Sequence, residues 1–417
     1  MRPRLRQILW GVLPTVFWAC LCFQLIRLHL CERYLVASGS MEPTIHGDPH
    51  GGDRVLVDKT AFWGQAPRAF ELVVVEAPRP GAHHLVKRFV AEGPCRVSLA
   101  EGDLFIGRGG GLERLVKYPG EHPDMSVTAY LFVASDRGAQ KLDWLHSDPE
   151  RWSLGPLGLH LHPCQDPELP LSADAQESRR SRRPQDDFLP GFLSLDRAVD
   201  VSFLNRMGHR LARGRSYPRD IGMELSLELE AGCSELVLVI EHRGVYYPLH
   251  YSVEGSGRLM IPDQPAVTFA GPALKFDRVF DLSYGFLDGR FFFRIGESPL
   301  LLHHPYPLPT DFGRLRTGHA GEPRFANLLH VGLVGAGGTI SRMRIFHDLH
   351  YQPDPDRVFE LGPDEIFVLG DNSLESSDSR DLSGIRDAAR IHFVRNDLIG
   401  RPIAVIGPWS EIRWLSH

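Results

Sequence analysis

The chain has 417 residues, about three times the ~150 residues of a typical domain, which leaves room for two hydrophobic cores. Its 46 Lys and Arg against 52 Asp and Glu give a formal net charge of −6, which disfavours nucleic acid as a partner. A hydrophobic fraction of 43% with 24% charged residues excludes wholesale disorder and a polytopic transporter. Six cysteines are too few for a disulfide-built scaffold and no CxxC pair occurs, so we expect no metal site and no cofactor.

An uncharged run opens the chain. Residues 8–26 read ILWGVLPTVFWACLCFQLI, close to the ~20 residues that cross a hydrocarbon core. Three arginines precede the run and two follow it, so the positive-inside rule predicts a cytoplasmic N-terminus. We expect a cytoplasmic segment at 1–7, a single transmembrane helix at 8–28 and the remainder outside the cell membrane, on its periplasmic or extracellular side. A cleavable signal peptide is the alternative, because LVAS at 35–38 is similar to a cleavage site.

Strand-like alternation follows. The stretches RVLVDK, FELVVVEAP and HHLVKRFV, separated by Gly and Pro, predict the first part of a β-rich domain over 36–115. Residues 116–189 are interpreted as a connecting segment and linker. Near its end the apolar residues become sparse and four arginines gather between positions 179 and 183. A solvated linker is the favoured interpretation there, and contact with phosphate or lipid is the alternative.

Residues 190–352 predict a second β-rich region. Met223, Leu225, Leu227 and Leu229 alternate with polar residues, and Asp288-Gly289 is typical of a hairpin turn. Short strands between turns predict an inserted, jelly-roll-like β-sandwich, so the fold class is mainly β. The aromatic residues of this region form its core or bind a protein or glycan ligand; they are Tyr246, Tyr247, Phe291, Phe292 and Phe293.

Four short motifs occur in a fixed order behind the apolar run. They are SGSMEPTIHGD from residue 38, GGDRVLVDK from 51, LVKRFV from 85 and FVLGDNSLESSDSRDLSG from 367. Together they resemble the type I signal peptidase family, membrane-anchored serine endopeptidases with a Ser/Lys dyad. The likeness covers residues 36–107 and 363–408, which implies a peptidase domain with a second part at 355–412 and a large insertion between the two parts.

The resemblance assigns roles to individual residues. It makes Ser40 the nucleophile and Lys87 the general base, with the Ser38 hydroxyl and the Ser40 backbone N–H as the oxyanion hole. Ser376 resembles the serine that hydrogen-bonds the lysine, and a supporting shell is implied for Asp371, Asp378 and Arg380. The resemblance also implies a pocket for the −1 side chain of the substrate. Its residues, which would equally serve as core, are Val36, Met41, Ile45, Leu85 and Val86.

A serine hydroxyl attacks a carbonyl only when a base takes its proton. A free lysine has a pKa of ~10.4, so burial must lower the pKa of Lys87 by ~2 to 4 units for it to serve as that base. Leu85 and Phe89 lie two residues on either side and can exclude water from the amine. His83 is a rival base on the same strand face, but Lys87 occupies the motif position.

The resemblance also implies the substrate. Preproteins with small residues at positions −1 and −3 of their signal peptides would bind extended, by strand addition, beside a membrane lipid surface. One alternative keeps the chemistry and assigns a narrow client recruited by the insert. Another is a catalytically relict, membrane-tethered binding protein. The chain departs from the family pattern at Phe70-Glu71, where Gly-Asp is usual, at Ala91–Cys95, and at Glu375, where asparagine is common.

Overall fold

The computed structural model describes most of the chain. The described residues are 3–78, 84–100, 102–117, 125–134, 142, 144–145, 151–164, 192–194, 203–204, 210–211, 218–242, 245–276, 278–306, 328–351, 357–380, 392–407 and 412–415. They form two compact units. Unit 1 comprises Met1–Ser98, Phe105–Glu113 and Arg357–His417, and unit 2 comprises Leu99–Leu104 and Arg114–Asp356. Strands dominate both units, which confirms the mainly β class.

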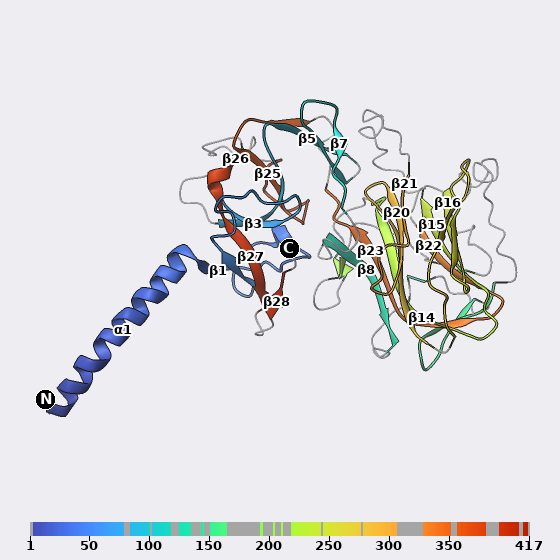
Figure 1. Cartoon of the computed structure of the whole chain (residues 1–417), viewed down its shortest axis with the longest axis horizontal. Coiled ribbons are helices and arrows are strands. Elements are labelled where there is room, and N and C mark those ends of the chain that lie inside the picture. The colour runs from blue at the N-terminus through green and yellow to red at the C-terminus, as the bar shows by residue number, and fades with distance from the viewer. Residues whose placement is uncertain are drawn as a thin grey trace. The chain divides into compact units, whose positions relative to one another are not determined.

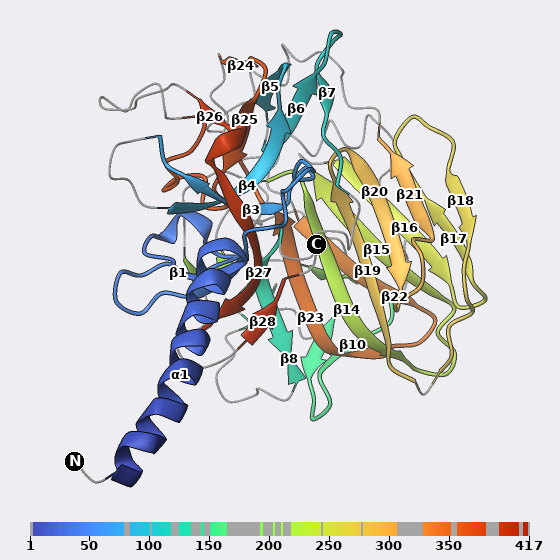
Figure 2. The same cartoon turned by 60° about the vertical axis from the view of Figure 1, so that its left-hand side comes forward.

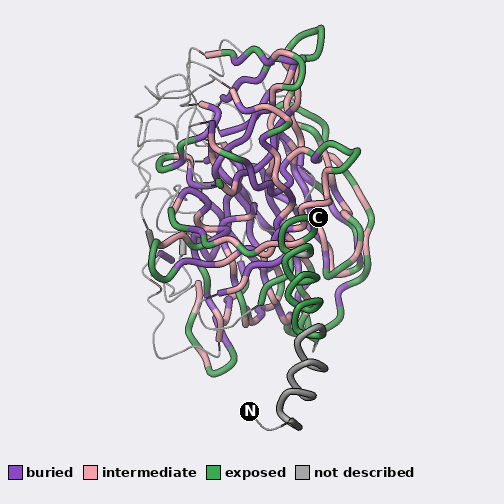
Figure 3. The backbone as a smooth tube through the Cα atoms, turned by 90° about the vertical axis from the view of Figure 1, so that its left-hand side faces the viewer, coloured by how far each residue is buried: buried purple, intermediate pink, exposed green. Residues whose placement is uncertain are grey.

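Helix α1 (Pro3–His29) opens unit 1. All of its residues from 15 to 25 are exposed, including Phe17, Trp18 and Phe23, and Figure 3 shows this part of the helix in the colour of exposed residues. Within the part of the chain that the structure describes, no helix combines the length and the apolar character needed to cross a membrane. The transmembrane helix expected at residues 8–28 therefore stays a prediction.

Eight described strands of unit 1 form an antiparallel sheet in the order β1-β2-β27-β3-β4-β25-β26, with β28 beside β27. Figure 1 labels β1, β3, β25, β26, β27 and β28 of this sheet. One sheet thus combines strands from both ends of the chain, with β27 inserted between β2 and β3. Their bounds are β1 (Cys31–Leu35), β2 (Arg54–Asp58), β3 (Leu72–Glu76), β4 (His84–Glu92), β25 (Glu365–Leu369), β26 (Phe393–Val394), β27 (Leu398–Ile406) and β28 (Ile412–Trp414).

Alternating side chains give this sheet an apolar cluster on each face. On β3, Leu72 and Val74 belong to one cluster and Val73 and Val75 to the other. The chain then enters a four-stranded sheet, within which it passes from one unit to the other. Its order is β24 (Val358–Leu361), β5 (Cys95–Ala100), β6 (Asp103–Gly107) and β7 (Glu113–Arg114).

Unit 2 is a β-sandwich of two antiparallel sheets, seen as two layers of strands in Figure 2. One sheet consists of β21 (Leu302–Pro305), β20 (Arg290–Ile295), β19 (Phe280–Leu287), β14 (Ile221–Leu229), β23 (Gly338–Asp348), β10 (Leu159–Leu161) and β9 (Trp152–Leu154), with β8 (Ser126–Val133) beside β23. The other consists of β11 (Leu193–Ser194), β22 (Leu328–Val334), β15 (Glu235–His242), β16 (Val245–Ser252), β17 (Ser256–Leu259) and β18 (Val267–Ala270). A separate hairpin joins β12 (Phe203–Leu204) and β13 (Arg210–Leu211).

Sequence patterns of the sandwich are confirmed in several places. The apolar residues of β14 are buried and alternate with partly exposed polar ones. Asp288 and Gly289 have φ values of 45° and 76°, the left-handed pair that a two-residue hairpin of type I′ requires. The five aromatic residues that were candidates for ligand binding are buried, which confirms their core interpretation: Tyr246, Tyr247, Phe291, Phe292 and Phe293.

The first strands of the sandwich correct one expectation. Strands β8, β9 and β10 lie within 116–189, the segment expected to be a connection, yet β8 and β10 pair with successive stretches of β23 on the edge opposite β14. On β8, Ala129, Tyr130 and Phe132 belong to the buried core cluster of the sandwich. The run of apolar and aromatic residues in β8 was a strand signal, masked by the polar stretch that follows. The four clustered arginines of the linker lie outside the described residues.

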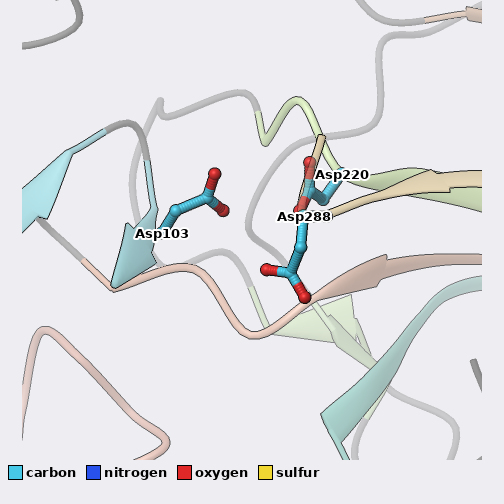
Figure 4. Close-up of side chains that lie close together, drawn as sticks. All are labelled: Asp103, Asp220 and Asp288. Atoms are coloured by element: carbon cyan, nitrogen blue, oxygen red, sulfur yellow. The ribbon is translucent and has the colours of Figure 1, made fainter. Parts of the chain in front are cut away.

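Unit 2 also contains a buried charge network. Lys117 Nζ lies 3.0 Å from Asp288 Oδ1 and 2.7 Å from Asp348 Oδ2. Asp103 Oδ2 lies 2.7 Å from Arg219 Nη2 and 3.0 Å from the Nε atom of Arg114. Asp220 accepts the Asp288 N–H through Oδ2, while its Oδ1 is 3.7 Å from Arg219 Nε (Figure 4 shows three of the aspartates). The network therefore contains four carboxylates (Asp103, Asp220, Asp288 and Asp348) and three basic side chains (Arg114, Lys117 and Arg219).

Burial shifts the protonation of these groups. Burial, together with the charge of Asp103, raises the pKa of Asp220 well above its usual range. Burial likewise raises the pKa of Asp348 to about 7, although Lys117 opposes the shift. Burial opposes the charge of Lys117, but Asp288 and Asp348 hold its pKa well above its usual range. Because one carboxylate has no matching base in the network, we expect the folded unit to retain one proton there, on Asp220.

Unit 1 has a buried ion pair that joins its two chain segments. Arg88 on β4 donates from Nε and Nη2 to the two carboxylate oxygens of Asp371 at 2.8 and 2.6 Å, and from Nη1 to the Phe70 carbonyl at 2.8 Å. Arg88 is 1% exposed. Such a two-pronged pair is planar and specific for arginine.

Removing Asp371 should strongly destabilise unit 1. Asp371→Ala leaves the Arg88 guanidinium buried without its carboxylate, and we expect a loss of about 3–5 kcal/mol in the free energy of unfolding. Chemical denaturation measures this loss. Glu92→Ala is the matched control, because its 3.1 Å pair with Arg395 is partly exposed and should be worth less than about 1 kcal/mol. Equal losses in the two variants would contradict the role of the buried pair.

Asp220→Asn should remove a pH dependence of stability. The folded chain holds a proton that the unfolded aspartate releases above its usual pKa of about 4, so wild-type stability should fall as pH rises from about 5 to 8. The variant carries no such proton, and its thermal midpoint should change less over this range. Asp288→Asn, which removes a partner of Lys117, should lower the midpoint at both ends of the range. Parallel pH profiles for wild type and Asp220→Asn would rule out proton retention at this residue.

Candidate active site

The serine of the first motif lies in a tight turn. Gly39–Met41 form a single 3-10 turn, which the Glu42 N–H closes by donating to the Gly39 carbonyl. Ser40 is 8% exposed, so its hydroxyl lies just below the surface. The exposed Ser38 donates from its hydroxyl to Ser40 Oγ at 3.3 Å. The Ser38 and Ser40 hydroxyls are thus brought together, and the oxyanion-hole assignment stays a prediction.

The lysine of the third motif lies on strand β4. Lys87 is 1% exposed, and its Nζ donates to Ser376 Oγ at 2.9 Å. Its strand neighbours Leu85 and Phe89 pack with the cluster that contains Val73 and Val75. Apolar side chains therefore flank the amine on its own face of the strand. The rival base His83 lies outside the described residues.

Glycine at position 370 lets the serine turn and the lysine partner approach one another. A Cβ atom on Gly370 would lie 2.1 Å from Ser376 Oγ and 2.6 Å from the Ser40 carbonyl oxygen, closer than real atoms permit. Ser376, which binds Lys87, and the backbone of Ser40 therefore meet at this glycine. Any side chain here would push them apart.

Asp378 and Arg380 stabilise the loop that carries Ser376. Arg380 donates to Asp378 from Nε at 2.9 Å and from Nη2 at 2.8 Å, and to Ser373 Oγ from Nη1 at 2.6 Å. Asp378 also accepts the Gly370 N–H at 2.9 Å. Burial alone would raise the pKa of Asp378, but the Arg380 hydrogen bond and charge, the Lys87 charge and the Gly370 N–H lower it below its usual range. The loop is thus fixed around an ionised carboxylate.

The expected pocket residues divide between two clusters. Val36, Met41 and Ile45 are buried together in one cluster, and Val86 packs against it. Leu85 instead packs against the cluster on the opposite face of the sheet. Because adjacent strand residues point to opposite faces, Leu85 and Val86 cannot line the same pocket wall from a regular strand. The pocket assignment stays a prediction for the other four.

Two residues that were not singled out from the sequence contact the serine turn or its support. Asn372 is 4% exposed; its N–H donates to the Ser40 carbonyl at 3.0 Å and its Nδ2 to the Gly39 carbonyl at 2.9 Å. Thr44 donates its hydroxyl to Asp371 at 2.5 Å. Asn372 is the third residue of the Gly-Asp-Asn motif, so the motif could have identified it as a candidate site residue. Nothing in the local sequence pairs Thr44 with Asp371, 327 positions away.

Two departures from the family pattern have visible consequences. Phe70, where glycine is usual, has a φ of 68°, in the left-handed region that favours glycine. Its N–H donates to the Phe89 carbonyl at 2.7 Å and its own carbonyl accepts from Arg88, so β4 holds the strained residue in place. Glu375, where asparagine is common, accepts a hydrogen bond from Asn372 Nδ2 at 3.2 Å.

The described residues contain one group that could hold a metal ion. Carboxylate oxygens of Asp103, Asp220 and Asp288 lie within 4.8 Å of one another (Figure 4). They belong to the network in which Lys117, Arg114 and Arg219 already supply positive charge. A divalent cation there would be repelled by three basic side chains, two of them buried, so the group fits an ion-pair network better than a cation site.

Comparisons with known proteins agree with part of the resemblance. Residues 9–131 match the family model described as "Signal peptidase, peptidase S26". A probable signal peptidase I of Mycobacterium leprae is 31% identical over 77 residues, which cover 18% of this chain and 27% of that protein. The matched stretch thus spans about a quarter of the relative's length. The family match includes the positions of Ser40 and Lys87, whereas the second part at 355–412 lies beyond it.

Similar solved structures share little with this chain. A non-specific endo-beta-1,3(4)-glucanase is 8% identical with a TM-score of 0.34, covering 56% of this chain and 95% of its own. Sheep galectin-11 is 10% identical with a TM-score of 0.22, covering 30% of this chain and 90% of its own. Both TM-scores are too low to support an argument about fold or ligand.

The family match covers the part of the chain that includes the first three motifs. Residues 9–131 of this chain are thus similar to the family described as "Signal peptidase, peptidase S26", and a stretch of 77 residues is similar to a probable signal peptidase I.

Proposed function

We propose that the chain is a membrane-anchored serine endopeptidase that removes N-terminal signal peptides from exported preproteins. The observation that carries the proposal is the buried amine of Lys87, which donates a hydrogen bond to Ser376 Oγ at 2.9 Å. Ser376 belongs to a loop whose Gly370 also contacts the Ser40 backbone. The family segment supports the peptidase class. The assignment of Ser40 and Lys87 as a catalytic dyad is part of this proposal.

In the proposed reaction, Ser40 Oγ attacks the scissile carbonyl while the neutral Lys87 amine takes the hydroxyl proton. The resulting oxyanion accepts hydrogen bonds from the Ser40 N–H and the Ser38 hydroxyl, donors of a kind worth about 3 kcal/mol each in other enzymes. The lysine then gives its proton to the leaving amine, and water releases the acyl group from Ser40. Ser376 orients the amine throughout, and Asp378 with Arg380 fixes the loop that holds Ser376.

The proposed substrate is a signal peptide with small side chains at −1 and −3. Val36, Met41, Ile45 and Val86 pack together at the turn that carries Ser40. A small apolar side chain would bind against this cluster, and a charged one would be excluded. Preproteins would bind as an added strand, so that backbone hydrogen bonds supply affinity without demanding a particular sequence.

A membrane anchor at α1 belongs to the same proposal. Its described residues 15–25 are all exposed, and they include Val16, Phe17, Trp18 and Phe23. A contiguous exposed apolar surface of this kind marks a membrane or protein contact. Anchoring would hold the peptidase at the surface where signal peptides emerge.

Anchoring and orientation can be tested together. A reporter that is active only outside the cytoplasm, fused after His417, should be active, because the arginines before the helix keep the N-terminus inside. Membrane fractionation of the same fusion should place the protein with the bilayer. Reporter activity confined to the cytoplasm would overturn the orientation, and a fusion found free of membrane would overturn the anchor.

Substitutions at the dyad test the chemistry. Ser40→Ala and Lys87→Ala should each abolish cleavage of a model preprotein, and the double variant should be no worse, because groups that act as one unit are strongly non-additive. Lys87→Arg should also fail, since a guanidinium cannot give up its proton. Turnover by wild type should rise with pH, because only the deprotonated amine accepts the serine proton.

His83→Ala serves as the control for the rival base. We expect it to cleave like wild type, with the mature N-terminus read by mass spectrometry. A folded His83→Ala protein without activity, together with an active Lys87→Ala protein, would falsify the Ser/Lys assignment.

A further inference from the structure

We infer that Asn372 is a positioning residue for the nucleophile and that Glu375 fixes the orientation of its side-chain amide. The inference rests on the proposed function, because it assigns Ser40 as the nucleophile. Asn372 binds both carbonyl groups of the dipeptide that presents Ser40. Its N–H donates to the Ser40 oxygen at 3.0 Å, and its Nδ2 donates to the Gly39 oxygen at 2.9 Å.

Two bonds to adjacent peptide groups hold an orientation that one bond cannot. The Gly39 and Ser40 carbonyls of the Gly39–Met41 turn both accept from Asn372. Because a carbonyl fixes the plane of its peptide group, the N–H groups of the turn, including that of Ser40, have a fixed direction. That N–H is the proposed backbone donor to the oxyanion. Asn372 thus acts through the turn and not by touching substrate, and a shift of the nucleophile by about 1 Å can cost about 100-fold in rate.

Glu375 decides which way the Asn372 amide faces. Nδ2 lies between two acceptors, the Gly39 carbonyl at 2.9 Å and Glu375 Oε2 at 3.2 Å. An amide oxygen in that position would face two oxygen atoms, so only the NH2 group fits. The Glu375 N–H also donates to the Asn372 carbonyl at 3.0 Å, which closes the loop around the pair. Glu375 is exposed while Asn372 is buried, so the carboxylate orients the amide from the solvent side.

The test compares isosteric variants on a model preprotein in detergent, normalised to folded protein. Asn372→Asp keeps the side-chain size but offers an acceptor where a donor is needed. Its kcat should fall about 10- to 100-fold while KM stays within about twofold, since the turn and not the substrate contact is altered. Glu375→Leu removes the acceptor and should lower kcat several-fold. Glu375→Gln keeps an acceptor oxygen and should restore kcat. Ser377→Ala, an exposed neighbour in the same loop, is the matched control.

Hydrogen–deuterium exchange gives a second readout that needs no activity. The Glu42 N–H that closes the turn onto the Gly39 carbonyl should exchange faster in Asn372→Asp than in wild type, and in Glu375→Gln it should match wild type. A wild-type protein that cleaves no preprotein would overturn the proposed function, and the exchange rates would still decide the role of Asn372. An unchanged kcat or an unchanged exchange rate in Asn372→Asp would overturn the positioning role. A loss of kcat that is fully explained by a lower thermal midpoint of the variant would also overturn it.

Discussion

Burial of the Lys87 amine against Ser376 Oγ is the contact on which the arrangement of unit 1 depends. The two residues are 289 positions apart, so the hydrogen bond requires β4 and the loop after β25 to lie side by side although the residues of unit 2 separate them in the chain. A buried amine without an acceptor would be costly. The sheet order β3-β4-β25, the close approach at Gly370 and the loop around Asp378 all serve to supply that acceptor.

The surrounding charges are arranged so that each has a partner. Arg88 points to the opposite face of β4 from Lys87 and binds Asp371, and Arg380 binds Asp378. These pairs place carboxylates close to the site without leaving a buried charge unpaired. They also join segments that are distant in the chain, which is why substitutions here should affect folding as well as chemistry. The network in unit 2 follows the same rule but carries one carboxylate more than its bases can match.

Local patterns predicted what depends on local chemistry. The alternation of β14, the Asp288-Gly289 turn and the motif positions of Ser40 and Lys87 could all be read from neighbouring residues. Contacts between distant residues could not. Thr44 with Asp371 and Lys117 with Asp288 and Asp348 have no sequence signal, because only the fold brings them together. Strand β8 was overlooked because a polar segment follows it, and Leu85 was placed in the pocket although its strand neighbour Val86 points to the other face.

The central claim is that the amine at position 87 is the base for Ser40, and chemical replacement of that amine tests it most directly. Lys87→Cys should be inactive, and alkylation of its thiol with 2-bromoethylamine should restore cleavage, because the product carries a primary amine at the end of a lysine-like side chain. That thioether amine is a weaker base than lysine, so the rising limb of the pH profile should move toward acid relative to wild type. Treated wild type controls for modification of the native cysteines. Full activity of unalkylated Lys87→Cys, or restored activity with an unshifted pH profile, would contradict the account.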